Sequence, residues 1–484
     1  MMLTKTTYLT YTQCSKAFWL AEYQPHLAAA PDPAAQRRLR AGQEVDRLAR
    51  AQFPGGILIP YRPRPEDMAL LTGQALAEGA ETLFQATFHV DDLLIKADIF
   101  TQTAVGWRLI EVKSSTNYKA DEHLPDVAFQ VYLLQQAGIH VSQVSLMHLN
   151  SDCHYPDLTN LFVLTDVTEA VQANLAQVEA DVAAMRRTAA QTEAAPETGI
   201  GRHCVKPSEC SFQAHCWQGI MDKTIYEIPY LKRPLEVQLE AAGIQYITDI
   251  PDGFALRDRR ATTFVETIQQ QQTVIDHDAI QTELAGLVYP LYFFDFETID
   301  YAVPTFADCK PYQQAPFQYS CHILEADGTL THRDYLHTDT EDPRRPLTEA
   351  LLNDIGDTGS IIVYFATFER GRLRELAEAF PEHAPRLMDM VDRLWDQLDI
   401  FKKHYRDYRF SGSNSLKSVL PVIVPELSYK LLAVQNGTQA QVVWEAMIGE
   451  GETAVKGQMV EQLRAYCHLD TLAMVKIHSA LLAL

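Results

Sequence analysis

The sequence lacks any apolar run long enough to cross a membrane, and its N-terminus, MMLTKTTYLTYTQC, has no apolar core of the kind found in signal peptides. These absences predict a cytoplasmic protein that does not bind membranes. Thiols stay reduced in the cytoplasm, so the eight cysteines are expected to be metal ligands or buried apolar residues rather than disulfides. The sequence also has no internal repeats.

Positive charge is in short supply as well. The chain has 41 Lys and Arg against 63 Asp and Glu, which gives a formal net charge of −22. Clustered basic side chains bind phosphate backbones, so this balance argues against a broad electrostatic surface for nucleic acid. It does not exclude a nuclease, because carboxylates that bind metal ions add negative charge. Basic residues are concentrated locally at 37–40 and 402–409, although a solvated helix face explains either cluster equally well.

The length and the patterning together predict more than one domain. At 484 residues, 47% of them apolar, the chain is too long for one ordinary core. β-rich runs at 81–113 and a helical pattern at 124–137 predict an α/β domain over residues 1–220. An aromatic strand, LVYPLYFFDFETIDY, opens a second domain over residues 286–484. Residues 221–285 are expected to be a linker with helical elements.

Acidic residues recur in the second domain next to apolar segments. Asp295 and Glu297 are two apart in a strand, so alternation places them on one face. Glu369 follows a second apolar strand, IIVYFATFE, and Tyr466 and Asp470 are four apart on a late helix, where they share a face. Carboxylates grouped in this way suit divalent cations that take oxygen ligands.

The order of these motifs resembles that of the DnaQ-like (DEDD) 3′–5′ exonucleases, which have an RNase H-like fold. The resemblance implies that four acids hold two Mg²⁺ or Mn²⁺ ions and that a tyrosine orients the attacking water. The implied residues are Asp295, Glu297, Glu369, Asp470 and Tyr466. Ala465 stands where histidine-type members have His, which indicates the tyrosine subtype, and His468 is expected to point off the shared face. The chain departs from the pattern at Glu369, where Asp is usual, and at Phe365, where Asn is frequent.

A second set of candidate residues lies in the first domain. Asp98 belongs to one β-rich run, and Glu111 and Lys113 are two apart in the next. An Asp followed by Glu-x-Lys on a strand resembles the PD-(D/E)xK nucleases, and Gln130 on the following helix matches a glutamine of the RecB-like members. The resemblance implies that the two acids bind Mg²⁺ or Mn²⁺. The lysine would polarise the water or stabilise developing negative charge.

The RecB-like pattern is incomplete. Members often carry Gly-x-x-x-His on an early helix, where this chain has Gly42 and Asp46. Leu134 stands where a tyrosine is expected, with Tyr132 two residues earlier, and Gln85 occupies a position where an extra acid is expected. The sequence therefore supports the fold of this domain better than its activity.

Three cysteines, Cys204, Cys210 and Cys216, are six residues apart in GRHCVKPSECSFQAHCW. A tetrahedral metal site or an iron–sulfur cluster usually takes four protein ligands. In the iron–sulfur branch of the RecB-like nucleases, one cysteine precedes the nuclease core and three follow it. Cys14 and these three resemble that layout, which implies a 4Fe–4S cluster. The sequence segments around these cysteines also resemble those of a bacterial family that joins such a module to a DnaQ-like domain.

Zinc is the alternative occupant of the cysteine site. Four thiolates bind Zn²⁺ tetrahedrally, and His203 or His215 can replace one of them. With either metal the centre is expected to be structural, tying the first helix of the module to its last segment. The remaining cysteines are expected to be apolar fillers: Cys153, Cys309, Cys321 and Cys467.

Taken together, the motifs predict a two-module, metal-dependent nuclease that acts on DNA or RNA, at single strands or ends. Two alternatives belong to other classes. One is a nucleic-acid-binding or scaffold protein with a degenerate N-terminal site. The other is a phosphohydrolase of small nucleotides, which fits the acidic net charge better than an enzyme of long polymers does. DNA repair, RNA turnover and phage defence are all compatible with the sequence.

Overall fold

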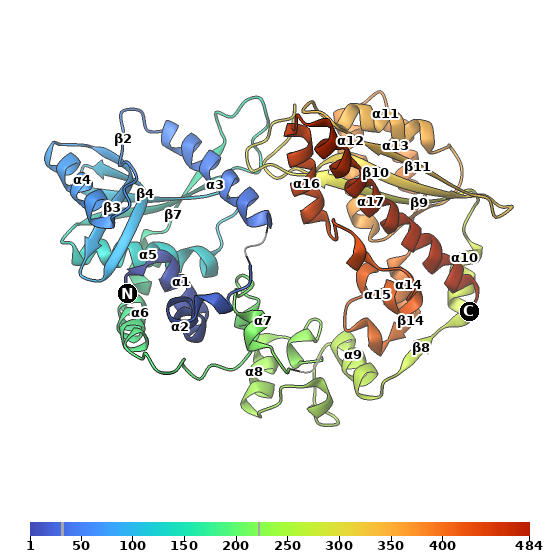
Figure 1. Cartoon of the computed structure of the whole chain (residues 1–484), viewed down its shortest axis with the longest axis horizontal. Coiled ribbons are helices and arrows are strands. Elements are labelled where there is room, and N and C mark those ends of the chain that lie inside the picture. Colours follow the sequence, from blue (N-terminus) through green and yellow to red (C-terminus); the bar gives the residue numbers. More distant parts are fainter. Residues whose placement is uncertain (31–32, 221–222) are drawn as a thin grey trace. The chain divides into compact units, whose positions relative to one another are not determined.

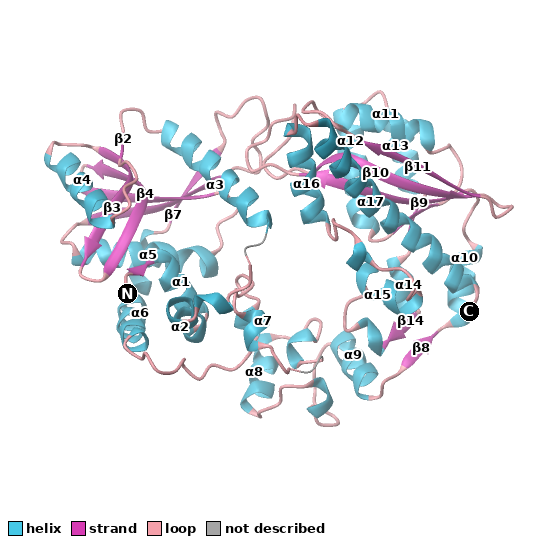
Figure 2. Ribbon diagram, viewed as in Figure 1, coloured by secondary structure: helices cyan, strands magenta, loops and turns pink. Residues whose placement is uncertain are grey.

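The structure is a computed structural model that describes residues 1–30, 33–220 and 223–484. Helices and strands are mixed throughout the chain (Figures 1 and 2), which confirms the predicted α/β class. The chain divides into two compact units: Met1–Ile220 with Tyr301–Gln313, and Met221–Asp300 with Gln314–Leu484. None of the helices in the described ranges has both the length and the apolar composition that a membrane span requires.

The described residues of the first unit form a seven-stranded mixed sheet. Its strands are β1 (Leu3–Thr4), β2 (Ile57–Leu58), β3 (Thr82–Val90), β4 (Leu93–Thr103), β5 (Gly106–Lys113), β6 (Val141–Leu149) and β7 (Phe162–Asp166). Six of them lie in the order β2-β3-β4-β5-β6-β7, and β1 pairs with β4. The β3-β4-β5 meander is antiparallel and β6 joins β5 in parallel. Helix α5 (Ala120–Gln136) makes the connection that this parallel pair requires.

Helices pack against both faces of this sheet. The larger apolar core lies between the strands and α1 (Lys5–Gln13), α4 (Pro65–Ala77), α5 and α6 (Thr168–Ala189), whereas α3 (Pro33–Ala51) packs on the opposite face. Alternation along β5 decides which side chains reach which face. Leu109 belongs to the larger core and Ile110 to the α3 side. Glu111 and Lys113 therefore share the α5 face with Leu109.

The last segment of Met1–Ile220 packs against its first helices. Here η2 (Arg202–Cys204) and α7 (Gln213–Cys216) follow α6, and α2 (Ser15–Tyr23) and η1 (Pro25–Leu27) follow α1. Phe212 packs in one apolar cluster with Trp19 and Leu20 of α2. The indole N–H of Trp19 donates to the carbonyl of Gln191 (2.5 Å), and the hydroxyl of Tyr23 donates to that of Ala189 (2.5 Å). These contacts join the first helices of Met1–Ile220 to its last residues.

Residues 301–313 belong to the first unit, although they connect two strands of the second. Ala302 packs in a small apolar cluster with Cys153, and the backbone N–H of Tyr155 donates to the carbonyl of Cys309 (3.0 Å). The sequence analysis places this segment in the C-terminal domain, because the chain runs through it without a change in composition. Its assignment depends on long-range packing that composition does not encode.

Five strands form the sheet in the described part of the second unit. They are β9 (Leu291–Ile299), β10 (Ala315–Leu324), β11 (Leu330–Leu336), β12 (Ile361–Val363) and β13 (Leu394–Asp396), in the order β11-β10-β9-β12-β13. Strand β10 is antiparallel to both of its neighbours, β9 and β11, and β12 and β13 run parallel to β9. Figure 1 shows the long helix α17 (Thr453–Leu482) beside this sheet, and it packs on β9 and β10.

Alternation along the central strand β9 separates an apolar face from a mixed one. Phe294 and Phe296 pack with α11 (Arg344–Asp354), α12 (Ala366–Ala379) and α13 (Ala384–Asp392). Phe293 packs on the other side with Met474 of α17. Asp295 has the parity of Phe293 and therefore faces α17. The strand thus supplies both a core anchor and an acidic pair.

Residues 221–285, predicted to be a linker, belong to the second unit. In the described part of this segment, η3 (Ile225–Glu227), α8 (Arg233–Ala241), η4 (Ile247–Asp249) and α9 (Arg259–Gln269) share a small core of their own. Next, α10 (His277–Ala285) packs on the end of α17, and β8 (Thr273–Ile275) pairs with β14 (Tyr405–Asp407). The remaining elements are α14 (Leu398–Lys403), η5 (Tyr408–Phe410), α15 (Leu416–Ile423), η6 (Tyr429–Leu431) and α16 (Gly437–Gly449).

Candidate functional site

Four acidic side chains meet between the sheet and α17 in the second unit. Asp295 and Glu297 come from β9, Glu369 from the first turn of α12 and Asp470 from α17. The latter three are each no more than 7% exposed. The structure therefore brings together all four acids that the sequence predicted as ligands. Cys467, predicted to be an apolar filler, also lies here, and its Sγ is within 4.8 Å of ligand oxygens of Asp295 and Glu297.

These four carboxyl groups are buried together without a paired cation. No ion pair to Lys or Arg involves them in the part of the chain that the structure describes. Burial first, and neighbouring carboxylates second, hold the pKa values of Asp295 and Glu297 well above their usual range. Burial also raises the pKa of Glu369 to about 8 and that of Asp470 to about 6.

The hydrogen bonding of the cluster also fits a cation site. Asp470, Glu297 and Glu369 add to the effect of burial in raising the pKa of Asp295. The Oε2 atom of Glu369 is buried and has no hydrogen-bond partner among the described residues. Oxygen atoms that repel one another and lack donors are the ligand set that Mg²⁺ and Mn²⁺ take. The donor set therefore fits the divalent ions that the resemblance implies.

Two tyrosines and a lysine border the carboxylates. Tyr466 lies one turn before Asp470 on α17, and the hydroxyl of Tyr429 donates to Asp470 Oδ1 (2.5 Å). Burial and Asp470 raise the pKa of both phenols, so both remain protonated at neutral pH. Lys417 of α15 places its Nζ 5.3 Å from the ring centroid of Tyr429 and 5.4 Å from that of Tyr466. Its positive charge lowers the pKa values of Glu297 and Asp470 against the effect of burial.

Sequence reasoning missed Tyr429 and Lys417. Neither residue belongs to a regular spacing with the acids, so no pattern in the sequence could have placed them at the site.

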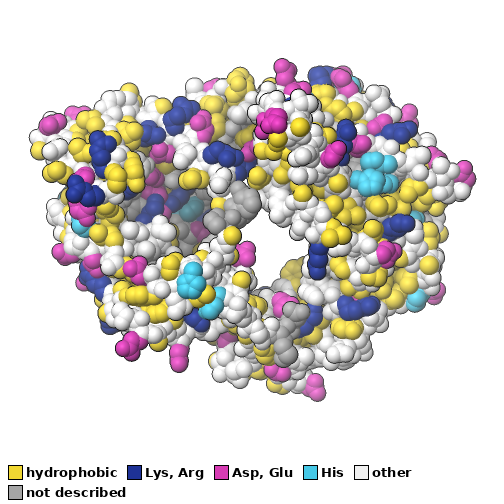
Figure 3. Space-filling view, viewed as in Figure 1, with side chains coloured by type: hydrophobic (Ala, Val, Ile, Leu, Met, Phe, Trp, Pro, Cys, Tyr) yellow, Lys and Arg dark blue, Asp and Glu magenta, His cyan; other side chains and the backbone are white. Residues whose placement is uncertain are grey.

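A pocket of about 940 Å³ opens onto this cluster, and its walls are aromatic and basic. The aromatic side chains are Tyr230, Phe264, Phe296, Tyr364, Phe365, Phe401, Phe410 and Tyr466, and the basic ones are Arg259, Arg260, Lys402, Arg406 and Lys417. The basic run predicted at 402–409 thus contributes two members, whereas Lys403 and Arg409 pair with Asp399 and Asp407. Figure 3 shows acidic and basic side chains interspersed over the visible face of the molecule.

Phe365 is the most unusual residue of the pocket. Its φ of 87° lies in the left-handed region, and its side chain is 49% exposed. Asn tolerates this backbone better than Phe does, which gives a physical reason for Asn at this position in the DEDD pattern. The strained turn is held by the backbone N–H of Phe365, which donates to Asp396 Oδ1 (2.9 Å). A residue that keeps an exposed aromatic ring on a strained backbone is a candidate for a functional contact.

Without a divalent ion, the stability of the second unit is expected to fall as pH rises. The four carboxyl groups have folded pKa values above their unfolded values, so the folded state binds protons that the unfolded chain has released. Their contribution is present below about pH 4, where unfolded carboxyls titrate, and is lost as pH rises towards the pKa of about 8 of Glu369. Thermal melts in EDTA from pH 5 to pH 8.5 measure this loss. Mg²⁺ is expected to reverse it at the alkaline end, and a pH-independent melt would contradict the prediction.

The predicted residues of the first unit also lie together, on β4, β5 and α5. Asp98 Oδ2 accepts a hydrogen bond from the backbone N–H of Val112 (2.9 Å). Lys113 Nζ donates to Glu111 Oε1 (2.9 Å), and Gln130 Nε2 donates to Glu111 Oε2 (2.8 Å). Glu111 is 1% exposed and Gln130 is fully buried. The arrangement is rigid because each side chain contacts at least one other.

Two residues that the sequence analysis did not single out complete this first site. Asp126 lies one turn before Gln130 on α5 and accepts hydrogen bonds from Gln130 (2.9 Å) and Lys113. Lys5 of α1 lies 2.7 Å from Glu111 Oε1 and 3.6 Å from Asp126 Oδ2. The i, i+4 spacing of Asp126 and Gln130 was a usable signal, whereas Lys5, more than 100 residues before Glu111, had none.

The two carboxylate sites differ in their charge balance. In the first, Lys5 and Lys113 more than offset burial and hold the pKa of Glu111 well below its usual range. Burial and Glu111 still raise the pKa of Asp98 to about 7 and also raise that of Asp126. Lysines form ion pairs with the carboxylates of the first site, whereas Lys417 lies near those of the second without an ion pair to them among the described residues.

The positions where the RecB-like pattern is incomplete have separate outcomes. Asp46, which replaces the patterned histidine, and Gln85 both lie at the site, because Gln85 Nε2 donates to Asp46 Oδ1 (3.3 Å) and Asp98 Oδ1 (3.1 Å). Gln85 holds a positive φ of 54° within β3. Leu134 is fully buried in the main core, and Tyr132 packs on its edge. Position 134 has no tyrosine, and Tyr132 does not lie among the carboxylates.

The four predicted cysteine ligands line one small cavity of about 10 Å³ in the first unit. Cys14 is the N-cap of α2, Cys204 ends η2, and Cys216 ends α7. None of the eight cysteines, all of which lie in described ranges, forms a disulfide. Four free thiols in one cavity are a donor set for a metal centre.

His203 lies among these thiols. It hydrogen-bonds Cys14 and Cys204, which raises the pKa of His203 to about 10. Burial raises the pKa of the Cys204 thiol, but hydrogen bonds from His203 and others lower it to about 7. The cavity has room for one atom the size of a water molecule. His203 is therefore a further nitrogen donor beside the four thiols.

Comparisons with known proteins cover parts of the chain. The model of a domain of unknown function (DUF2779) matches residues 292–415, which include Asp295, Glu297 and Glu369 but not Asp470. The chain is 31% identical over 212 residues to the uncharacterized protein MG366 homolog of Mycoplasma pneumoniae (38% of this chain, 31% of the relative). It is 29% identical over 239 residues to the uncharacterized protein UU173 of Ureaplasma parvum serovar 3 (44% and 34%). The chain thus spans about a third of the length of these relatives. No solved structure matches it significantly.

Proposed function

We propose that the second unit is a metal-dependent 3′–5′ exonuclease with an RNase H-like fold. The observation that carries the proposal is the buried group Asp295, Glu297, Glu369 and Asp470, which has no paired cation in the described chain and faces a pocket of basic and aromatic side chains. Buried like charges are costly unless a cation neutralises them. Basic groups and exposed rings beside them suit a phosphodiester chain with bases to stack.

The residues of this site take separate roles in the proposed reaction. The four acids would hold two divalent ions, which would supply activation of water and charge stabilisation of the leaving oxygen. Tyr466 stays protonated, so it orients the water by hydrogen bonding rather than by removing its proton. Lys417 adds positive charge beside Asp470, where negative charge develops on the phosphate. Phe365 presents an exposed ring on which a base can stack.

For the first unit we propose a RecB-like PD-(D/E)xK fold with a second nuclease site. Asp98 and Glu111 would bind Mg²⁺ or Mn²⁺, and Lys113 would act on the water. The ammonium of Lys5 contacts Glu111, one of the two carboxylates that would bind an ion, and also lies near Asp126. Metal binding there therefore competes with Lys5, and we propose that this site is the weaker of the two.

Replacing Lys5 with Met is expected to test that competition. The substitution leaves Glu111 and Asp126 with one cation instead of two. It should cost about 2–3 kcal/mol of unfolding free energy without metal, less than the about 3–5 kcal/mol typical of broken buried pairs, because Lys113 still contacts both acids. Calorimetric titration should then detect tighter Mn²⁺ binding. Lys119→Met, which removes an exposed pair with Glu122, is the matched control and should change neither quantity appreciably. Unchanged Mn²⁺ affinity in Lys5→Met would refute the competition.

We further propose that Cys14, Cys204, Cys210 and Cys216 hold a structural metal centre. The family resemblance favours 4Fe–4S, and the small cavity with His203 inside it favours a single Zn²⁺. Anaerobic purification distinguishes them. A brown protein with iron and sulfide identifies the cluster, and a colourless protein with stoichiometric zinc identifies the ion.

The proposed activity is tested on 3′- and 5′-labelled single- and double-stranded DNA and RNA with Mn²⁺. Stepwise loss of nucleotides from the 3′ end is the expected result. Binding of these oligonucleotides without any cleavage would favour a nucleic-acid-binding or scaffold protein instead. Hydrolysis of free nucleotides but not of oligonucleotides would favour a phosphohydrolase of small substrates.

A further inference from the structure

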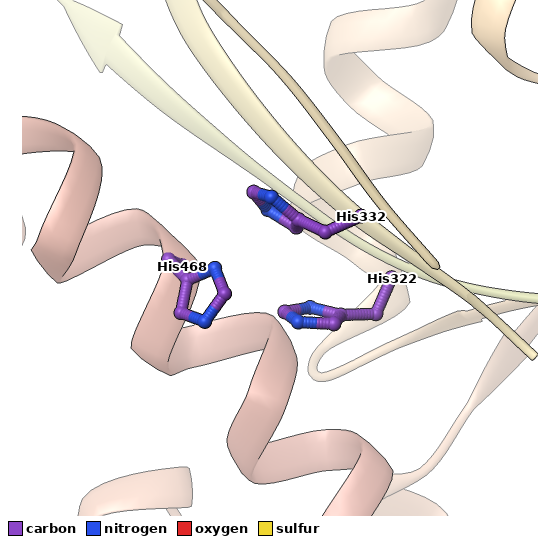
Figure 4. Close-up of side chains that lie close together, drawn as sticks. All are labelled: His322, His332 and His468. Atoms are coloured by element: carbon purple, nitrogen blue, oxygen red, sulfur yellow. The ribbon is translucent and has the colours of Figure 1, made fainter. Parts of the chain in front are cut away.

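Three histidines of the second unit face one another between the sheet and α17 (Figure 4). His322 of β10 pairs directly with His332 of β11, and His468 extends from α17 towards both. The ring centroids are 4.5 Å (His322–His332), 4.6 Å (His322–His468) and 4.5 Å (His332–His468) apart. One ring nitrogen from each lies within 4.8 Å of the others. From the sequence, His468 is expected to point off the face shared by Tyr466 and Asp470, and the other two histidines belong to no motif.

In two of these histidines, one ring nitrogen lies within hydrogen-bond distance of a hydroxyl group. Thr471 Oγ1 lies 2.8 Å from Nδ1 of His322, and Ser320 Oγ lies 2.9 Å from Nε2 of His332. The two hydroxyls are 2.7 Å apart and so form one network. Neither Nε2 of His322 nor Nδ1 of His332 has a hydrogen-bond partner among the described residues. Metal-binding histidines are held in this way, with one nitrogen on an outer partner and the other free for the ion.

The surroundings of His322 favour its neutral form. His322 is 3% exposed, and burial followed by the neighbouring rings lowers its pKa to about 3. His332 and His468 are half-buried, so the group can be reached from solvent. The three rings lie close enough together for one ring nitrogen of each to contact a single ion. An ion that takes nitrogen ligands uses all three.

We propose that His322, His332 and His468 form a binding site for a transition-metal ion of the zinc class. Three imidazole nitrogens and one open position for water make the four-coordinate geometry that Zn²⁺ and Co²⁺ adopt. Nitrogen ligands discriminate against Mg²⁺, which prefers oxygen, so this site differs in chemistry from the four carboxylates. It does not depend on the proposed nuclease activity.

Its position points to a structural role. His468 lies two residues before Asp470 on α17, and Ser320 on β10 is the strand partner of Asp295 on β9. An ion held here would join α17 to the β10–β11 hairpin. It would thereby stabilise the position of Asp470 relative to Asp295.

The test is a titration of the full-length protein, purified with its thiolate centre filled, with Co²⁺ in excess Mg²⁺. Mg²⁺ occupies the carboxylates, so tetrahedral Co²⁺ bands report the nitrogen site. We expect one equivalent with visible bands in the wild type, Asp295→Asn and His383→Gln proteins. His332→Asn and His468→Gln should lose that equivalent, and Thr471→Val should bind it about 10–100-fold more weakly. Zn²⁺ should raise the melting temperature of the wild type but not of His332→Asn.

His383 is the N-cap of α13, away from the three histidines, and controls for the loss of any histidine. Circular dichroism and the metal-free melting temperature identify which variants fold. His332 is half-exposed, so His332→Asn is the variant least prone to misfold. If the wild type takes up no such equivalent, or if folded His332→Asn and His468→Gln bind Co²⁺ like the wild type, the proposal is wrong. Either result leaves the nuclease proposal standing, because the oligonucleotide assay reports that independently.

Discussion

Replacing Asp295 with Asn is expected to slow degradation of 3′-labelled single strands about 10³-fold or more, while raising the melting temperature of the metal-free protein. The loss follows because bound metal ions contribute several kcal/mol of charge stabilisation, and each factor of ten in rate corresponds to about 1.4 kcal/mol. The gain follows because Asp295 is repelled by Asp470, Glu297 and Glu369. A residue that only supported the fold would not have these opposite effects.

The matched control is Asp392→Asn at the end of α13. This acid is exposed and distant in sequence from the four ligands, so neither rate nor melting temperature should change appreciably. Rates are measured with Mn²⁺ under single-turnover conditions, and melts are recorded in EDTA at pH 8. If Asp295→Asn degrades every oligonucleotide as fast as the wild type, the exonuclease assignment is wrong.

Replacing Cys14 with Ala is expected to empty the proposed metal centre and to unfold the segment that carries its other ligands. Structural zinc sites contribute about 10–16 kcal/mol of binding free energy, which stabilises the fold only while the ligand set is complete. Cys14 on α2 is separated from Cys204 by 190 residues, so the centre joins distant parts of the chain. Without it, residues 190–220 depend on one small apolar cluster around Phe212.

Metal analysis and limited proteolysis measure the two parts of this expectation. Cys14→Ala should contain less than stoichiometric iron or zinc and should be cleaved rapidly within residues 190–220. Cys153→Ala removes a fully buried thiol from a separate apolar cluster and should keep the full metal content. Equal metal content and equal protease resistance in wild type and Cys14→Ala would exclude a shared four-thiolate centre.

Local periodicity was enough to identify many candidate residues. A spacing of two on a strand places Asp295 and Glu297 on one face, and a spacing of four on a helix does the same for Tyr466 and Asp470. In each pair the backbone alone decides the direction of the side chains. The mixed α/β class follows from the same periodicities, because a window of about ten to fifteen residues is enough to recognise a strand or helix pattern.

The positions of separate elements relative to one another depended on tertiary packing. Lys5 neutralises Glu111, and residues 301–313 join the first unit, through contacts between segments far apart in the chain. His468 is expected from the sequence to point off the face shared by Tyr466 and Asp470, and the fold alone decides that it meets His322 and His332 there.

The sequence by itself determined which side chains share a strand or a helix face. Tertiary structure decided which faces meet, and therefore which carboxylates have a cation nearby and which do not. The physical reason is that side-chain direction is a property of the local backbone. Charge balance and burial are sums over neighbours from the whole fold.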